Sequence, residues 1–280
     1  MKLALYIRHD KLWQDARVLH LESALQALSP KFSTYRTGPG GRLDGDTGML
    51  LSIGGDGTFL SAAALVGSSG VPILGVNLGR IGFLSENAPE EALRKLASGG
   101  YGVEDRGLLH VDVFAPGSSE PMTDAVTPWP YAVNEVALLR KGAAMLGVDV
   151  SLDGVKLPTY WADGLLVATS SGSTAYSLSV GGPIVMPESK VCILSPVAPH
   201  NLNVRPLVVP DGSVLEITLQ AREDQFSLSL DNRLHSVGTG VRLRIALARF
   251  SLKRVRLAGS NFIGALTDKL YWGEDLRNTK

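Results

Sequence analysis

Short apolar runs alternate with segments of helical spacing in the first hundred residues. The pattern predicts, in order, a strand at 3–7, a helix at 11–28, a strand at 49–53, a helix at 59–66, a strand at 71–76 and a helix at 89–97. The last helix opens with a proline and two glutamates, which favour a helix N-terminus. Strands and helices in alternation are typical of a mostly parallel sheet covered by helices, so this part is expected to be an α/β domain.

Strand signals dominate after residue 101. Turn residues such as Asp153-Gly154 separate them, and 117–130 is expected to be a surface loop. The predicted strands are 103–114, 131–139, 146–152, 165–169, 191–194, 214–219, 226–230, 241–247 and 252–257. We therefore expect an α/β domain at 1–100 and a β-rich domain at 101–258, with the helix-compatible tail 259–280 returning to the first domain.

Charge and composition limit which binding partners and which kinds of site are expected. The 280 residues include 27 basic and 27 acidic ones, so the formal net charge is zero and no global field favours nucleic acid or an anionic membrane. Cys192 stands alone in an apolar run, and the five histidines are scattered, so no metal site is expected from these residue types. No apolar run approaches the ~20 residues of a membrane span, and the early charges argue against a signal peptide, so a cytoplasmic protein is expected.

Residues 54–58 read Gly-Gly-Asp-Gly-Thr between a predicted strand and a predicted helix. Such a turn exposes backbone N–H groups that can bind phosphate, and the helix dipole favours the anion. Asp56 would repel that phosphate, so its presence makes sense if it accepts a proton or positions a hydroxyl or a metal there. The alternative is that Asp56 only caps the helix.

Two further clusters follow predicted strands. The segment 77–83 carries two glycines three residues apart at a strand end, where ligands bind in open α/β sheets; a plain turn is the alternative. Asn134 and Glu135 interrupt an apolar strand and point to opposite faces, so one of them is buried. Burying it without a partner costs about 2–7 kcal/mol, and either a ligand or an internal hydrogen bond can supply that partner.

The longest cluster, 162–179, runs from an apolar strand into a loop of small and hydroxyl residues. Small residues let a flat ring lie against the backbone, hydroxyls orient it, and Tyr176 offers a stacking face. The alternative is an ordinary Ser/Thr-rich turn. The chain has neither a Gly-x-x-x-x-Gly-Lys loop nor a Gly-x-Gly-x-x-Gly fingerprint, so any phosphate chemistry depends on these clusters.

Taken together, the clusters resemble the NAD kinase family in order and spacing. The matching segments are 54–58, 77–83, 134–135, 163–176, 181–184 and 199–207, which span most of the chain. The first motif is shared with diacylglycerol-type lipid kinases, whereas 163–176 is far more specific to NAD kinases. Departures from the family pattern are Trp161 for an arginine, Ser170-Ser171 for Pro-Thr, and Arg233 for a glutamine.

The resemblance implies an α/β N-terminal domain plus an all-β C-terminal domain, the two-domain NAD kinase-like architecture. It also implies transfer of the ATP γ-phosphate to the adenosine-ribose 2′-hydroxyl of NAD, with Asp56 as the base and Mg²⁺ or another divalent metal. The implied binding residues are Gly54, Gly55, Gly57, Thr58, Leu60, Asn77, Gly79, Phe83, Asn134, Glu135, Asp163, Thr174, Ala175, Tyr176, Ser177, Leu178, Ser179, Ala198 and Asp231. A homodimer or homotetramer is implied, in which Ala198 can reach a neighbour's NAD.

Two other functions are compatible with parts of the pattern. A lipid kinase shares the glycine turn but needs an apolar entrance, which the Ser/Thr-rich loop at 169–177 argues against. A non-catalytic dinucleotide-binding module gains nothing from an acid at Asp56. The sequence therefore predicts small-molecule partners, NAD and ATP, and neither nucleic acid nor membrane.

Overall fold

The chain folds into two compact units. The computed structural model describes residues 1–79 and 82–273; parts of the expected 77–83 loop and of the 259–280 tail lie outside these ranges. The first unit comprises residues 1–105 together with the chain from 252 onward, and the second comprises Arg106–Ser251. Within the described ranges, none of the helices has the length and apolar character needed to cross a membrane.

The first unit is built on a six-stranded sheet with strand order β2-β1-β3-β4-β19-β5. Its elements are β1 (Lys2–Tyr6), a 3-10 turn (Asp10–Gln14), α1 (Ala16–Ala27), β2 (Ser33–Thr37), β3 (Thr47–Ile53), α2 (Asp56–Val66), β4 (Ile73–Val76), α3 (Pro89–Ser98), β5 (Tyr101–Arg106), β19 (Leu252–Leu257) and α6 (Phe262–Leu270). The strands from β2 through β19 pair in parallel.

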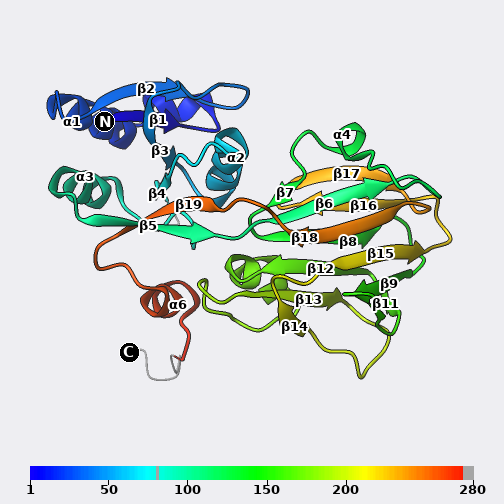
Figure 1. Ribbon diagram of the computed structural model, residues 1–280. Helices are drawn as coiled ribbons and strands as arrows, with labels where there is room; N and C mark the ends of the chain where they lie inside the picture. Colours follow the sequence, from blue (N-terminus) through cyan, green and yellow to red (C-terminus); the bar gives the residue numbers. More distant parts are fainter. Residues whose placement is uncertain (80–81, 274–280) are drawn as a thin grey trace. The chain divides into compact units, whose positions relative to one another are not determined.

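Helices cover both faces of this sheet (Figure 1). The helices α1 and α3 bury Leu21, Leu25 and Leu96 against one face, in a core shared with Leu51 of β3. The helix α2 lies on the other side, where it packs against β3 and β4. The strand β3 is buried along most of its length, as expected for the centre of a parallel sheet.

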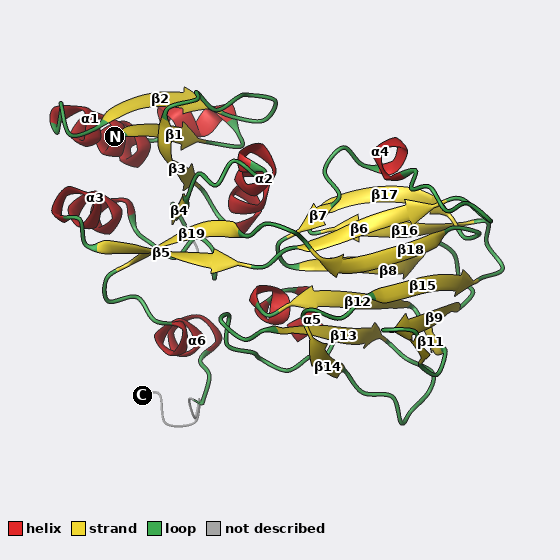
Figure 2. Cartoon of the chain, in the orientation of Figure 1, coloured by secondary structure: helices red, strands yellow, loops and turns green. Residues whose placement is uncertain are grey.

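The second unit is a sandwich of two antiparallel sheets, drawn in yellow in Figure 2. One sheet has the order β10-β9-β15-β18-β6-β7 with β11 beside β9, and the other has β14-β13-β12-β8-β16-β17. The strands are β6 (Leu109–Phe114), β7 (Tyr131–Ala132), β8 (Glu135–Arg140), β9 (Leu146–Leu152), β10 (Val155–Lys156), β11 (Tyr160–Ala162), β12 (Gly164–Thr169), β13 (Val191–Val197), β14 (Leu207–Pro210), β15 (Leu215–Gln220), β16 (Gln225–Leu230), β17 (Arg233–Gly238) and β18 (Arg242–Leu247). One apolar core includes Val111 and Ile245 from the first sheet and Leu138 and Leu165 from the second.

The structure differs from the sequence expectation in a few places. The predicted strand 103–114 is two strands, β5 and β6, which belong to different sheets. Because β5 and β19 join the α/β sheet, the unit boundaries fall after residue 105 and before 252, whereas the sequence suggested 100 and 258. The expected loop 117–130 contains a short helix, α4 (Thr123–Val126).

Candidate functional site

The glycine turn joins the end of β3 to the start of α2. Gly54 has φ +149°, and a Cβ there would collide with the Thr58 side chain, so this position needs glycine. Gly55 is the exposed N-cap of α2, with open space where a side chain would lie. The first N–H groups of a helix lack intrahelical partners, so this turn offers donors and room to an anion.

The carboxylate of Asp56 does not cap the helix. It lies in the first turn of α2, which begins after Gly55, and it binds a segment almost 30 residues further along the chain. Oδ2 accepts a hydrogen bond from the Phe83 backbone N–H at 2.9 Å, and Oδ1 accepts from Leu84 at 3.1 Å and Ser85 at 2.8 Å. A carboxylate has about four acceptor positions, so three donors leave Oδ2 able to accept one more proton.

The segment 82–85 is shaped around that carboxylate. A Cβ at Gly82 would lie within 3.0 Å of both Asp56 oxygens, so only glycine fits there. Asn77 is buried and holds the same loop, because its Nδ2 donates to Ser85 O at 2.9 Å and its Oδ1 accepts from Gly79 N–H at 2.6 Å. Gly79 itself is exposed and has open space around it. Asn77 therefore shapes the loop, and Gly79 lies at its accessible side.

A buried ion-pair network supports this loop, and our sequence reasoning missed it. Arg254 of β19 is buried; its Nη2 lies 2.7 Å from Glu86 Oε1, and its Nη1 lies 2.8 Å from Glu104 Oε1. Arg254 Nη2 also donates to Phe83 O at 3.4 Å. The available signal was an arginine inside the apolar strand 252–257, since buried charges are rare unless paired.

In the second unit, the structure brings the Asn134-Glu135 cluster and the hydroxyl-rich loop together. The Thr169 hydroxyl donates to Val133 O at 2.7 Å, and the Thr169 N–H donates to Asn134 O at 2.8 Å. Gly172 packs so closely on the Asn134 backbone that a Cβ would collide with it. The two motifs, more than 30 residues apart in sequence, therefore form one surface.

Asp231 fixes the backbone of that surface. It sits at the turn between β16 and β17 with φ +54°. Its Oδ2 accepts from the Val133 N–H at 3.0 Å, and its Oδ1 accepts from Asn134 at 2.7 Å and Glu135 at 3.3 Å. Asp231 thus positions the backbone of the Asn134-Glu135 cluster through three N–H groups.

Arg233 completes this arrangement from the same turn. Its guanidinium donates to Trp129 O at 2.5 Å and to Tyr131 O. Asp231 and Arg233 together hold the N–H and C=O groups of residues 129–135, and we call this pair the hairpin clamp. Arg233, which departs from the family pattern, therefore has its own hydrogen-bond partners in this chain, the carbonyl groups of Trp129 and Tyr131.

Glu135 carries the most perturbed carboxyl group of this surface. Burial, and then the nearby charge of Asp231, raises the pKa of Glu135 to about 8, although a backbone hydrogen bond from Tyr176 favours the charged form. Burial also raises the pKa of Asp231, against the opposing effect of its N–H donors and Arg233. Among the described residues, Glu135 Oε2 has no hydrogen-bond partner. A buried polar atom without a partner is unusual, so Oε2 is available to a ligand.

The run 174–179 has mixed exposure. Tyr176 is 37 % exposed and Ser179 is exposed, whereas Thr174, Ala175 and Leu178 are half-buried. Ser177 is fully buried, and its hydroxyl lies 2.9 Å from the Ser195 hydroxyl. In the first unit, Leu60 lies half-buried on α2 and Phe83 lies half-buried in the loop beside Asp56.

Asp163 and Ala198 lie at the other end of β12 from the hydroxyl-rich loop. The Asp163 N–H donates to Val197 O at 2.9 Å, directly before Ala198, which is exposed with φ +44°. The Asp163 carboxylate lies 2.6 Å from Arg140 Nε. A six-residue strand spans about 20 Å, so one chain presents its predicted dinucleotide-binding residues in two separated groups.

Trp161 lies in β11, two residues before Asp163. Its ring lies against the backbone of Gly147 and is 37 % exposed. It lines a cavity of about 540 Å³ with Met145 and Arg222.

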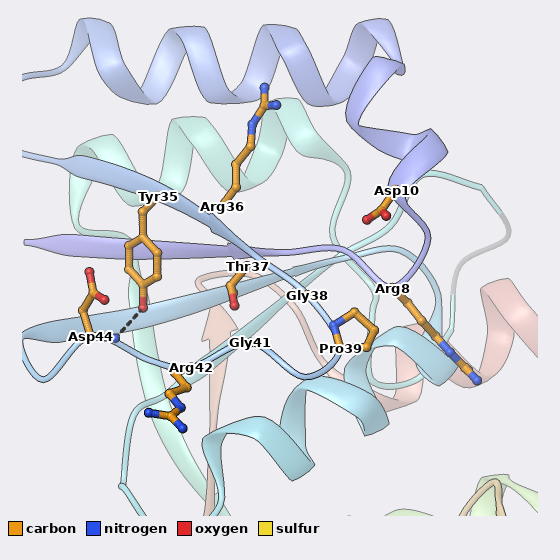
Figure 3. Close-up of a pocket in the computed structure, with 10 residues that line it drawn as sticks. All are labelled: Arg8, Asp10, Tyr35, Arg36, Thr37, Gly38, Pro39, Gly41, Arg42 and Asp44. Atoms are coloured by element: carbon orange, nitrogen blue, oxygen red, sulfur yellow. Dashed lines mark hydrogen bonds between the residues drawn. The ribbon is translucent and has the colours of Figure 1, made fainter.

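One polar cavity in the first unit contains none of the predicted site residues. It measures about 580 Å³ and lies where β1 and β2 end (Figure 3). Arg8 and Arg42 lie at opposite ends of it, while Arg36 extends to one side and pairs with Glu22. These cations do not converge on one point, so the cavity lacks the focused charge of an anion site.

Two family models match this chain. Residues 40–99 match the ATP-NAD kinase N-terminal domain, and residues 133–257 match the ATP-NAD kinase C-terminal domain. Together they cover more than half of the chain.

The chain belongs to the ATP-NAD kinase family.

Curated members of the ATP-NAD kinase family are similar over most of their length. The NAD kinase of Flavobacterium johnsoniae is 43% identical over 249 residues, which cover 87% of this chain and 83% of that protein. The NAD kinase of Bacteroides fragilis is 41% identical over 239 residues, 83% of this chain and 79% of that protein. The family assignment confirms the predicted resemblance and favours an NAD kinase over a lipid kinase or a non-catalytic module.

Solved structures share the fold. The yeast NADH kinase complexed with NADH matches with a TM-score of 0.85 at 22% identity, covering 100% of this chain and 90% of that one. An NAD kinase from Archaeoglobus fulgidus in complex with ATP matches with a TM-score of 0.77 at 27% identity, covering 97% and 99%. The expected architecture of ATP-NAD kinases, an α/β N-terminal domain plus a β-rich C-terminal domain, is confirmed.

Proposed function

We propose that this ATP-NAD kinase transfers the γ-phosphate of ATP to the 2′-hydroxyl of the adenosine ribose of NAD, giving NADP, with Asp56 as the proton acceptor. The observation that carries this proposal is the Asp56 carboxylate, which three backbone N–H groups hold beside the glycine turn. A fixed carboxylate can take the hydroxyl proton as the P–O bond forms, and the turn's N–H groups bind phosphate without adding a charge.

We assign NAD binding to the β-rich unit. Glu135 Oε2 is a buried acceptor without a partner among the described residues, which suits a ribose hydroxyl. Asn134 and the loop leading to Tyr176 lie beside it, and the exposed Tyr176 ring suits stacking. In this proposal Ser177 acts by shaping the surface, since its buried hydroxyl lies beside that of Ser195, and Asp231 acts chiefly by fixing the backbone of residues 133–135.

The residues also fit a divalent metal that arrives with ATP. The described ranges contain no group of three or more His, Cys, Asp or Glu side chains able to hold an ion by themselves. Mg²⁺ usually keeps several waters and is held largely by substrate phosphates, so the polyphosphate of ATP and water would hold the ion, while the free acceptor position of Asp56 stays with the hydroxyl proton. When bound, the metal would neutralise charge on the transferring phosphate.

We further propose a homodimer or homotetramer, on the basis of the two separated residue groups at the ends of β12. If Asp163 and Ala198 serve a neighbour's NAD, then Glu135→Ala and Asp163→Ala should each be inactive alone and regain activity when mixed. Failure to complement would contradict the shared site.

A cytoplasmic location and a role in NADP biosynthesis remain predictions from the sequence and the family.

The decisive test compares acceptors and the Asp56→Asn variant. Purified protein with ATP and Mg²⁺ should form NADP from NAD, measured with an NADP-specific dehydrogenase, and should not phosphorylate diacylglycerol. Asp56→Asn should fold normally and lose about 10²–10⁴ in turnover, because general-base assistance is removed. Asp46→Asn, at an exposed acid of the same unit, should retain activity. Full turnover in Asp56→Asn would reject the assigned base, and absence of NADP with the wild type would reject the reaction.

A further inference from the structure

Lys269 of α6 reaches the loop that holds Asp56. Its ammonium group donates to Gly82 O and lies 4.6 Å from the centre of the Phe83 ring, a cation–π distance. It also lies 4.0 Å from Glu86 Oε2. Only 9% of its side chain is exposed, which is unusual for lysine.

The loop is therefore held from two sides. Its N–H groups at 83–85 donate to Asp56, and its carbonyl groups at 82 and 83 accept from Lys269 and Arg254. Fixing both sides of a peptide segment leaves it little freedom to rotate. The C=O of Gly82 and the N–H of Phe83 belong to one planar peptide, so the cation at Gly82 directly orients one of the three N–H groups that hold Asp56.

Packing alone does not explain a lysine at this position. Four charged side chains act on its ammonium group: Glu86 and Asp56 favour its charge, as does Asp268 on its own helix, while Arg254 opposes it. Burial outweighs the three acids and lowers the pKa of Lys269. A well-packed apolar residue is often at least as stabilising as a buried charge, so the charge itself calls for an explanation.

We propose that Lys269 is a positioning residue for phosphoryl transfer: it holds the Gly82–Ser85 segment and thereby keeps Asp56 in place at the glycine turn. The proposal rests on the role of Asp56 proposed above. The C-terminal helix α6 thus contributes to the reaction through one side chain.

The test uses the full chain with Lys269→Met, which keeps length but removes charge and donors, and Lys269→Gln, which restores a neutral donor. Lys253→Met is the control, because Lys253 is a partly exposed lysine of β19 paired with Asp105 at 3.6 Å. We expect Lys269→Met to lower kcat by about 10–100-fold, as displaced catalytic groups do, with KM for NAD unchanged. Lys269→Gln should fall between, and Lys253→Met should match the wild type.

Two further measurements separate positioning from a general structural role. In Lys269→Ala, added ethylamine should restore part of kcat, because a small ammonium ion can occupy the vacated position. Hydrogen exchange should show faster exchange at the 83–85 amides in Lys269→Met, with the β-rich unit unaffected. Wild-type kcat in Lys269→Met, or unchanged exchange at 83–85, would overturn the proposal.

The same assays distinguish the two proposals. If Asp56→Asn is inactive and Lys269→Met is fully active, the role of Asp56 stands and that of Lys269 fails. If Asp56→Asn is fully active, the proposed base fails, and exchange at 83–85 still reports whether Lys269 holds the loop.

Discussion

Replacing Gly82 by alanine is expected to disable phosphoryl transfer while leaving the fold intact. The new methyl group would lie within 3.0 Å of the Asp56 carboxyl carbon and of both its oxygens, closer than real Cβ atoms approach. Either the carboxylate or the 82–85 segment must move. The colliding atoms belong to Gly82 and Asp56, both partly exposed, so the sheet of the α/β unit should remain stable.

The expected loss follows from the contacts at stake. Asp56 accepts three N–H groups, and each hydrogen bond to a charged group is worth about 1.5–3 kcal/mol. Moving a reacting group by about 1 Å can cost about 100-fold in rate. At 1.36 kcal/mol per tenfold, that is about 2.7 kcal/mol, which is roughly the loss of one or two of these hydrogen bonds.

The assay is kcat for NADP formation, read together with the unfolding temperature. Gly45→Ala is the control, because Gly45 is an exposed glycine of the same unit with open space at its Cβ position and no proposed role in the site. Gly45→Ala should keep both values. If Gly82→Ala also keeps its kcat, then the contact between this loop and Asp56 has no part in turnover and the reasoning is wrong.

Three other measurements address the β-rich unit. Asp231→Asn should raise the KM for NAD by about tenfold or more, because one carboxamide oxygen cannot replace a carboxylate that accepts three N–H groups. Asp153→Asn, at another positive-φ turn, is the control and should leave the KM unchanged. An unchanged KM for Asp231→Asn in steady-state kinetics would show that the hairpin clamp plays no part in NAD binding. Burial raises the pKa of Glu135 from 4.5 to about 8, so the folded protein binds this proton more tightly than the unfolded chain and stability falls as pH rises between those values. Thermal unfolding should show that decline in the wild type and a smaller one in Glu135→Gln; equal declines would contradict it. Burial also raises the pKa of the Cys192 thiol to about 12, so iodoacetamide should label this cysteine only after unfolding, and rapid labelling of the folded protein would refute its burial.

The sequence predicted those strands and helices whose hydrophobic pattern is clear within a short segment. The strand and helix flanking the glycine turn are observed as β3 and α2, because a central parallel strand is apolar throughout and its pattern is unambiguous. The strands β2 and β17 were not predicted. Both lie at sheet edges, where many side chains face solvent and the apolar signal is weak.

The contacts that shape the site could not be predicted from local pattern. Asp56 binds amides 27 to 29 residues away, and Asp231 binds amides 96 to 98 residues away. Motif spacing marks such acids as unusual, but it does not say whether they face a ligand or a backbone. The division of 103–114 between two sheets could not be predicted either. Alternation of apolar and polar residues marks a strand, but it does not say which other strand it will pair with.

The position of β19 sets the order in which the chain can complete its folding during synthesis. It lies between β4 and β5 in the sheet, yet about 145 residues separate it from β5 in sequence. The β-rich unit is continuous and can fold as it leaves the ribosome, since domains generally fold as units. The edge of β4 stays open until β19 emerges, and open edges invite aggregation. The nascent α/β unit is thus exposed for most of translation, and at a synthesis rate of about 5–20 residues per second that interval lasts roughly 10–30 s, a window in which a chaperone can act.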